Sequence, residues 1–204
     1  MQEYHQLVRE AIFLKELRDW DEREGAELQA LGCRRVECGG KLDRAFYPRA
    51  LRGHELEINQ LSRRRVSYCC RRCRRRHTPV SVRFLSYKSY SHISVLMTLV
   101  LYSGRSPEVT LRKIRTVSGA SEVTVRRWRT WIAEFLNTRE WKALRAKLSP
   151  LFEVARFPAS LVELFQLGGG SLAETLVATL RFLKVLSRTP HQNAFCSTDL
   201  HSTK

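Results

Sequence analysis

Residues 33–40 read Cys-Arg-Arg-Val-Glu-Cys-Gly-Gly, and residues 68–73 read Tyr-Cys-Cys-Arg-Arg-Cys. Tetrahedral zinc sites are built from two such groups of thiolates, each carried by a short loop. The glycines after the second cysteine suit a backbone that turns tightly around a bound sulfur. The pattern therefore predicts a zinc ribbon in which one Zn2+ ion is bound by Cys33, Cys38, Cys70 and Cys73.

The sequence leaves part of this ligand set open. Cys69 and Cys70 are adjacent, and only one of them can normally reach the metal; Cys70 is favoured because Cys70-x2-Cys73 has the usual spacing. His77 follows Cys73 by four residues and can replace a cysteine. The first group, Cys33-x4-Cys38, is the wider one, so a site without Cys33 also fits the pattern.

The chain is strongly basic. Its 204 residues include 36 Lys+Arg and 20 Asp+Glu, which gives a formal net charge of +16. Such a surface favours a polyanionic partner, because each neutralised phosphate releases condensed counterions. Arginine greatly outnumbers lysine, and its guanidinium fork matches phosphate oxygens and guanine edges. We therefore expect double-stranded DNA as the partner, although a solvated basic surface has the same composition.

A dense arginine run surrounds the second cysteine group. No acidic residue lies between residues 63 and 76, so local carboxylates cannot pair these arginines. A bound metal would hold the run rigid, and the cations would help to keep the thiolates ionised. Charge runs are usually solvated, but here we expect contact with phosphates and no reading of bases. The residues expected to make this contact are Arg71, Arg72, Arg74, Arg75 and Arg76.

Residues 111–128 carry a second motif, Leu-Arg-Lys-Ile-Arg-Thr-Val-Ser-Gly-Ala-Ser-Glu-Val-Thr-Val-Arg-Arg-Trp. Gly119 and Ala120 suit the turn of a helix-turn-helix, and Ser121 suits the N-cap of the helix that follows. Arg115 stands where a small residue usually lies, which leaves an ordinary basic helix bundle as the alternative. The helical period buries Val125, Trp128, Ile132 and Phe135. The expected DNA contacts are Ser121, Val123, Thr124, Arg126, Arg127, Arg129 and Thr130, with Thr124 and Arg129 nearer to phosphates.

The expected fold is mainly α with a small β zinc ribbon. It comprises an N-terminal helical segment (1–32), the ribbon (33–88), a three-helix helix-turn-helix domain (89–148), C-terminal helices (149–187) and an unstructured tail (188–204). The apolar periodicity predicts helices at 3–20, 25–32, 91–103, 107–119, 121–136, 139–148 and 159–167, and a last one from Ser171. Alternating and β-prone runs predict strands at 41–47, 65–69 and 80–87.

Several stretches extend these motifs: Cys38-Gly39-Gly40-x-Leu42, Tyr47-Pro48-Arg49 with Arg52-Gly53, Cys69-Cys70, Pro79-x-Ser81-Val82-Arg83-Phe84-Leu85 and Thr124-Val125-x-Arg127-Trp128. Together they resemble a family of short bacterial proteins linked to mobile elements and described mostly as uncharacterised or transposase-related. The resemblance covers roughly residues 33–186. It implies a zinc ribbon with a helix-turn-helix and a role beside a transposase or integrase. The chain departs from the family's Cys-Pro-x-Cys-Gly-Gly first knuckle and has a shortened second one.

The sequence favours a binding protein over an enzyme. A DDE transposase needs three carboxylates that hold two metal ions, and no aspartate lies between residues 44 and 198. The expected function is a non-catalytic, sequence-reading DNA-binding accessory or regulator of a transposase or integrase. The alternatives are a scaffold that docks a partner through the apolar stripe at 159–186, a DNA-binding fragment of a transposase, and an RNA-binding zinc ribbon.

No stretch reaches the roughly 18 to 20 consecutive apolar residues of a membrane span, and the first residues lack the basic and apolar regions of a signal peptide. We therefore expect no membrane partner and a reducing, cytoplasmic location associated with the nucleoid, where cysteines bind metal more often than they form disulfides. The DNA target and the oligomeric state do not follow from the sequence.

Overall fold

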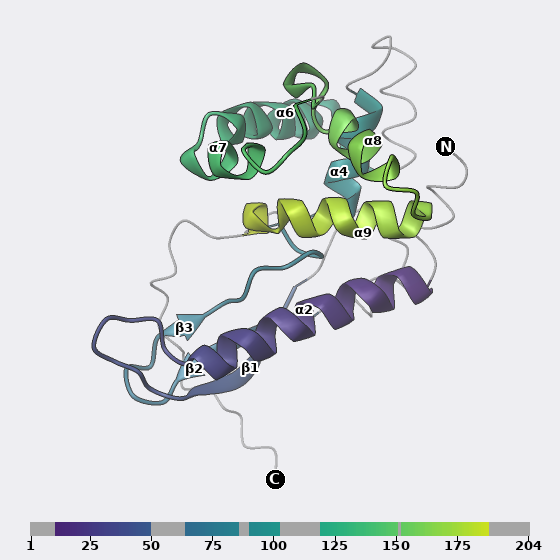
Figure 1. The fold of residues 1–204 in the computed structure, drawn as a ribbon. Helices are drawn as coiled ribbons and strands as arrows, with labels where there is room; N and C mark the ends of the chain where they lie inside the picture. The colour runs from purple at the N-terminus through teal and green to yellow at the C-terminus, as the bar shows by residue number, and fades with distance from the viewer. Residues whose placement is uncertain (1–10, 50–63, 86–89, 103–118, 151, 188–204) are drawn as a thin grey trace.

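The computed structural model describes residues 11–49, 64–85, 90–102, 119–150 and 152–187 (Figure 1). This part of the chain is mainly helical and carries one small sheet, which confirms the mainly α character and the small sheet of the expected fold. The helices are α2 (Ala11–Leu31), α4 (His92–Tyr102), α6 (Glu122–Leu136), α7 (Arg139–Arg145), α8 (Ala159–Gln166) and α9 (Leu172–Phe182), with 3-10 turns at Val154–Arg156 and Leu183–Ser187.

The sheet contains β1 (Leu42–Pro48), β2 (Arg64–Cys70) and β3 (Arg76–His77) in the order β1-β2-β3, with both pairs antiparallel. Leu42 lies opposite Cys70, so the first cysteine loop ends beside the second. The strands predicted at 41–47 and 65–69 are confirmed. The strand predicted at 80–87 is wrong for residues 80–85, and residues 86–87 lie outside the described residues.

A buried carboxylate from α2 binds Ser81, Val82 and Arg83, where the chain bends at residues 82–83. Asp21 accepts hydrogen bonds from the Val82 N–H at 2.8 Å and from Arg83 Nε at 2.7 Å. The Ser81 hydroxyl donates to the same carboxylate at 2.7 Å and accepts the Arg83 N–H at 3.1 Å. The distant Asp21 and the local Ser81 thereby take the backbone N–H groups of Val82 and Arg83, which a sheet would otherwise need.

Helix α2 is continuous, whereas the sequence predicted two helices separated near residue 25. Gly25 does not break the helix; it lets the helix lie close to β2, because a Cβ atom at this position would be 2.7 Å from the Tyr68 hydroxyl oxygen. This close approach offsets the helix-propensity cost of glycine, which is about 1 kcal/mol relative to alanine. Residues 3–10 of the predicted first helix lie outside the described residues.

The same helix joins two apolar cores. Phe13 and Leu17 belong to the core among the helices, and Leu28 belongs to the core under the sheet. In Figure 1, α2 runs from the strands at one end to the helices at the other. On α2, the Trp20 ring also receives the Arg181 guanidinium of α9, 3.8 Å from its centroid. The sheet and the helices are therefore connected through a shared rigid element.

The C-terminal apolar stripe lies inside the chain's own core. Leu176 and Leu180 are 0% exposed and Leu183 is 2% exposed. The capping box predicted at the start of α9 is confirmed, because the Ser171 hydroxyl accepts the Glu174 N–H and the Glu174 carboxylate accepts the Ser171 N–H. These leucines are thus not available to dock a partner.

Candidate metal centre and nucleic-acid interface

Four cysteine sulfurs converge between the two cysteine loops. The Sγ atoms of Cys33, Cys38, Cys70 and Cys73 all lie within 4.8 Å of one another, and none of these residues is in a disulfide. The Cys33–Cys73 and Cys38–Cys70 sulfur pairs are 3.6 Å and 3.7 Å apart. Four sulfurs bound at the usual zinc distance occupy a tetrahedron with edges of about 3.8 Å. The cluster therefore fits a four-thiolate metal site.

The first loop, residues 33–40, connects α2 to β1. The Cys33 N–H donates to the Gly40 carbonyl at 3.0 Å, and the Cys38 N–H donates to the Arg35 carbonyl at 3.1 Å, which closes the loop on itself. A Cβ atom on Gly40 would lie 2.7 Å from the Cys70 sulfur. A side chain at the second glycine of this loop would therefore collide with a sulfur of the cluster.

The second loop lies between β2 and β3. The Cys70 N–H donates to the Arg75 carbonyl, and the Arg74 N–H donates to the Cys70 carbonyl, both at 3.0 Å. The Cys73 N–H faces the Cys70 sulfur at 3.5 Å. These backbone contacts hold Cys70 and Cys73 on one side of the loop, facing the first cysteine loop.

The cysteines of the cluster differ in acidity. Burial raises the pKa of Cys33 to about 12. The Arg75 N–H is the main cause that lowers the pKa of Cys73 to about 6. Because a metal binds thiolates, occupation of this site must displace the Cys33 proton, so affinity should fall as pH falls.

The structure bears on the two ligand questions that the sequence leaves open, which are Cys69 or Cys70, and His77 or Cys33. Cys70 lies in the cluster, whereas the Cys69 sulfur faces the carbonyls of Cys70 and Arg74 at 4.0 Å and 3.8 Å. His77 Nε2 lies 3.2 Å from the Cys33 sulfur, at the edge of the four-sulfur group. Burial is the main cause that lowers the pKa of His77, and nearby arginines add to it. The structure therefore favours Cys70 over Cys69 and keeps Cys33 in the cluster.

The arginine run is less free than its sequence suggested. Arg71 Nε lies 2.8 Å from both carboxylate oxygens of Asp43 on β1, and this hydrogen bond lowers the pKa of Asp43. Arg72 Nη1 donates to the Cys38 carbonyl at 3.0 Å. No acid of the run itself pairs Arg71, as expected, but Asp43 of a neighbouring strand does. Its partner is distant in sequence, and only the strand register reveals it.

The remaining arginines of the run differ in exposure. Arg76 holds its guanidinium 5.7 Å from the centroid of the Tyr47 ring, and Arg75 is half-buried. Arg74 is exposed and occupies a left-handed turn with φ of 56°. Among the five residues expected to contact phosphate, Arg74 is therefore the best placed to do so from this loop.

Helix α6 begins as predicted. The chain turns at Gly119, Ala120 is 1% exposed, and the Ser121 hydroxyl accepts the Thr124 N–H as an N-cap. The predicted buried face is confirmed, since it consists of Val125, Trp128, Ile132 and Phe135. The preceding predicted helix at 107–119, with Arg115, lies almost entirely outside the described residues, which resume at residue 119.

The opposite face of α6 is exposed at Val123, Arg126, Arg127 and Thr130. Val123, an apolar side chain on the same face as the two arginines, is 58% exposed. Arg126 forms an ion pair with Glu122 one turn earlier. Arg129 stacks on Tyr102 of α4 at 4.3 Å, so its guanidinium is already engaged by the protein.

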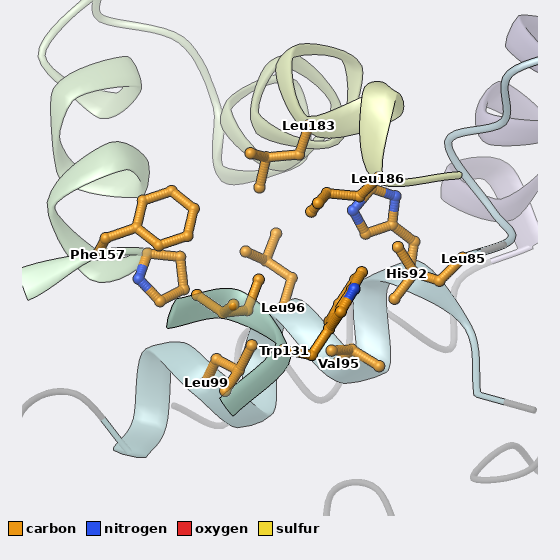
Figure 2. A pocket seen from close by; sticks show the side chains of 11 residues that line it. Leu85, His92, Val95, Leu96, Leu99, Trp131, Phe157, Leu183 and Leu186 are labelled. Carbon is orange, nitrogen blue, oxygen red and sulfur yellow. The ribbon is translucent and has the colours of Figure 1, made fainter. Parts of the chain in front are cut away.

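A small apolar cavity lies among α4, α6 and the C-terminal elements (Figure 2). Its volume is about 10 Å³, room for about one water molecule and far less than a metabolite needs. His92 and Trp131 are among its lining side chains. Burial lowers the pKa of His92 to about 3, so this imidazole is neutral at physiological pH.

None of the described helices has the length and apolar character needed to cross a membrane. Comparison with known proteins gives no matching family model, no matching curated protein and no matching solved structure.

Proposed function

We propose that this chain is a zinc-dependent protein that binds double-stranded DNA and reads sequence with helix α6. The exposed face of α6 is the observation that carries the proposal. Val123, Arg126 and Arg127 lie on it together, opposite a fully buried apolar face. Arginine can bond to guanine in the major groove, and an apolar group can contact the thymine methyl group.

Docking in a groove would cover Val123, whose side chain is 58% exposed in the free chain, and burial of this apolar group would favour binding. The N-terminal end of α6 is also capped by its own serine, so this end is ordered before any partner arrives. The overall charge of +16 would then supply the non-specific attraction that brings the helix to the duplex.

In this proposal the metal site has a structural role. Zinc bound by the four cysteines would fix the two loops and present Arg74 to the phosphate backbone. Arg71 and Arg72 would stabilise the loops through Asp43 and the Cys38 carbonyl. The ribbon thus contributes affinity and orientation, while α6 contributes specificity.

The biological process rests on the resemblance to mobile-element proteins alone. On that basis we propose that the chain acts in the cytoplasm, at the nucleoid, as a non-catalytic accessory or regulator of a transposase or integrase. The scaffold alternative loses its main support, because Leu176 and Leu180 of the C-terminal stripe are buried in the chain's own core.

Selection from a randomised duplex library, followed by binding over a salt series, tests the proposal. The native protein should select a motif, and Arg126→Ala with Arg127→Ala should relax it. Arg74→Ala should weaken all duplexes equally and reduce the salt slope by about 1. Arg156→Ala removes an exposed arginine that pairs with Glu163 in the C-terminal region, so it serves as the matched control. A motif unchanged by the double substitution would refute the role of α6.

A further inference from the structure

We propose that His77 is not a metal ligand but a positioning residue that donates a hydrogen bond to the Cys33 thiolate and so slows loss of the metal. His77 Nε2 lies 3.2 Å from the Cys33 sulfur, and the imidazole is 8% exposed. The inference rests on the metal site of the proposed function and is independent of DNA binding.

The distances separate a donor from a ligand. All four sulfurs lie within 4.8 Å of one another, and two of the pairs are 3.6 Å and 3.7 Å apart, close to the edge of about 3.8 Å in a four-thiolate zinc site. If His77 were bound to the same zinc ion as Cys33, its nitrogen and that sulfur would be about 3.6 Å apart, from the usual Zn–N and Zn–S lengths. The observed 3.2 Å is shorter and suits an N–H group directed at sulfur.

The direction of the hydrogen bond follows from the metal. A metal-bound thiolate has no proton to donate, so it can only accept. If Nε2 of His77 presented a lone pair to Cys33, two electron-rich atoms would face each other in a buried site. The favourable tautomer therefore carries its proton on Nε2, and the N–H spreads part of the thiolate charge onto the imidazole.

The contact also joins two parts of the ribbon. His77 belongs to β3 and lies opposite Tyr68 of β2, whereas Cys33 begins the loop that follows α2. The hydrogen bond therefore ties the first cysteine loop to the β2–β3 hairpin. Outer partners of metal ligands typically change metal affinity by about 10- to 100-fold when they are removed, and we expect an effect in this range.

The first test needs no substitution. Cadmium-loaded protein with isotopically labelled histidine is examined by NMR, after its metal content has been measured. A slowly exchanging Nε2–H of His77, coupled weakly to cadmium through the Cys33 sulfur, supports the proposal. A direct one-bond coupling between Nε2 and cadmium makes His77 a ligand and overturns it. If the chain binds no divalent metal, both the role of His77 and the metal site are overturned. Failure to bind DNA contradicts only the proposed DNA binding and leaves these two conclusions unchanged.

The second test measures metal release to a chelator, with cobalt absorption reporting the number of bound thiolates. His77→Phe should release metal about 10- to 100-fold faster with the thiolate count unchanged. His77→Gln keeps an N–H donor and should recover part of this loss; it also serves if the phenylalanine variant does not fold. Val36→Ala, at an 84% exposed position in the same loop, is the control and should match the native protein. Native release rates in both His77 variants would overturn the proposal.

Discussion

Removal of the Asp21 carboxylate should destabilise the protein far more than removal of the adjacent Glu22 carboxylate on α2. Asp21 and Arg83 are both 6% exposed at their side chains, and Asp21 also accepts hydrogen bonds from Ser81 and Val82. Asp21→Ala removes the carboxylate that pairs with the buried Arg83 guanidinium, and breaking a buried ion pair typically costs about 3–5 kcal/mol. This is a large part of the 5–15 kcal/mol that commonly separates folded from unfolded domains.

Glu22 supplies the matched control, because it forms an ion pair with Arg44 at the surface. Solvent screens such a pair, so Glu22→Ala should cost less than about 1 kcal/mol. The double variant Asp21→Leu with Arg83→Leu removes both buried charges but leaves the Val82 N–H unsatisfied. It should therefore lie within about 1–3 kcal/mol of the native protein and be more stable than Asp21→Ala.

Urea unfolding at a fixed excess of zinc measures these differences, because constant zinc makes the linked metal term equal in all variants. The reasoning is refuted if Asp21→Ala and Glu22→Ala lose the same stability, or if the double variant is less stable than Asp21→Ala. Either result would mean that the Asp21–Arg83 pair is not a buried charge pair in solution.

Three further predictions concern single positions. Gly40→Ala places a Cβ atom 2.7 Å from the Cys70 sulfur and should weaken zinc retention by more than about 10-fold in a competition with a chelator. If the variant retained zinc as well as the native protein, this would contradict the geometry of the first loop. Burial lowers the pKa of His92 from about 6.5 in the unfolded chain to about 3 in the folded chain, so the unfolded state binds the proton first. The free energy of unfolding should therefore fall by about 1.4 kcal/mol per pH unit as pH drops from 6.5 toward 3. His92→Phe should show a shallower fall in urea unfolding, and equal slopes for the two proteins would refute this. Replacing thymine by uracil in the selected duplex removes the methyl group that Val123 would cover, so it should weaken native binding by about 0.8 kcal/mol, roughly fourfold, and leave binding by Val123→Ala unaffected. Fluorescence anisotropy gives the ratio of the thymine and uracil dissociation constants for each protein, and equal ratios would show that Val123 does not read a base.

The sequence was informative where local chemistry determines structure. Cysteine spacing located the four-sulfur cluster, because loops that share a metal have a narrow range of lengths. The N-caps at Ser121 and Ser171 marked helix starts, since a side-chain oxygen there satisfies a backbone N–H in the same turn. These features depend on residues close together in the chain.

The errors arose from contacts between distant segments. Gly25 resembled a helix end, but its role is set by Tyr68, which lies more than forty residues later. Residues 80–85 alternate like a strand, yet Asp21 captures their backbone and side-chain donors. The pairing of Arg71 with Asp43 depends on strand register, which a charge count does not contain. His77 was recognised as a candidate ligand, but its position beside Cys33 required the fold.

The most direct test of the account is duplex binding over a salt series, with the zinc content measured on the same purified sample. The account predicts one zinc ion per chain, lost in Cys70→Ser and Cys73→Ser, and an affinity whose logarithm falls linearly with the logarithm of salt concentration, with a slope of about −0.9 per phosphate contact. A chain with neither zinc nor duplex affinity would contradict it.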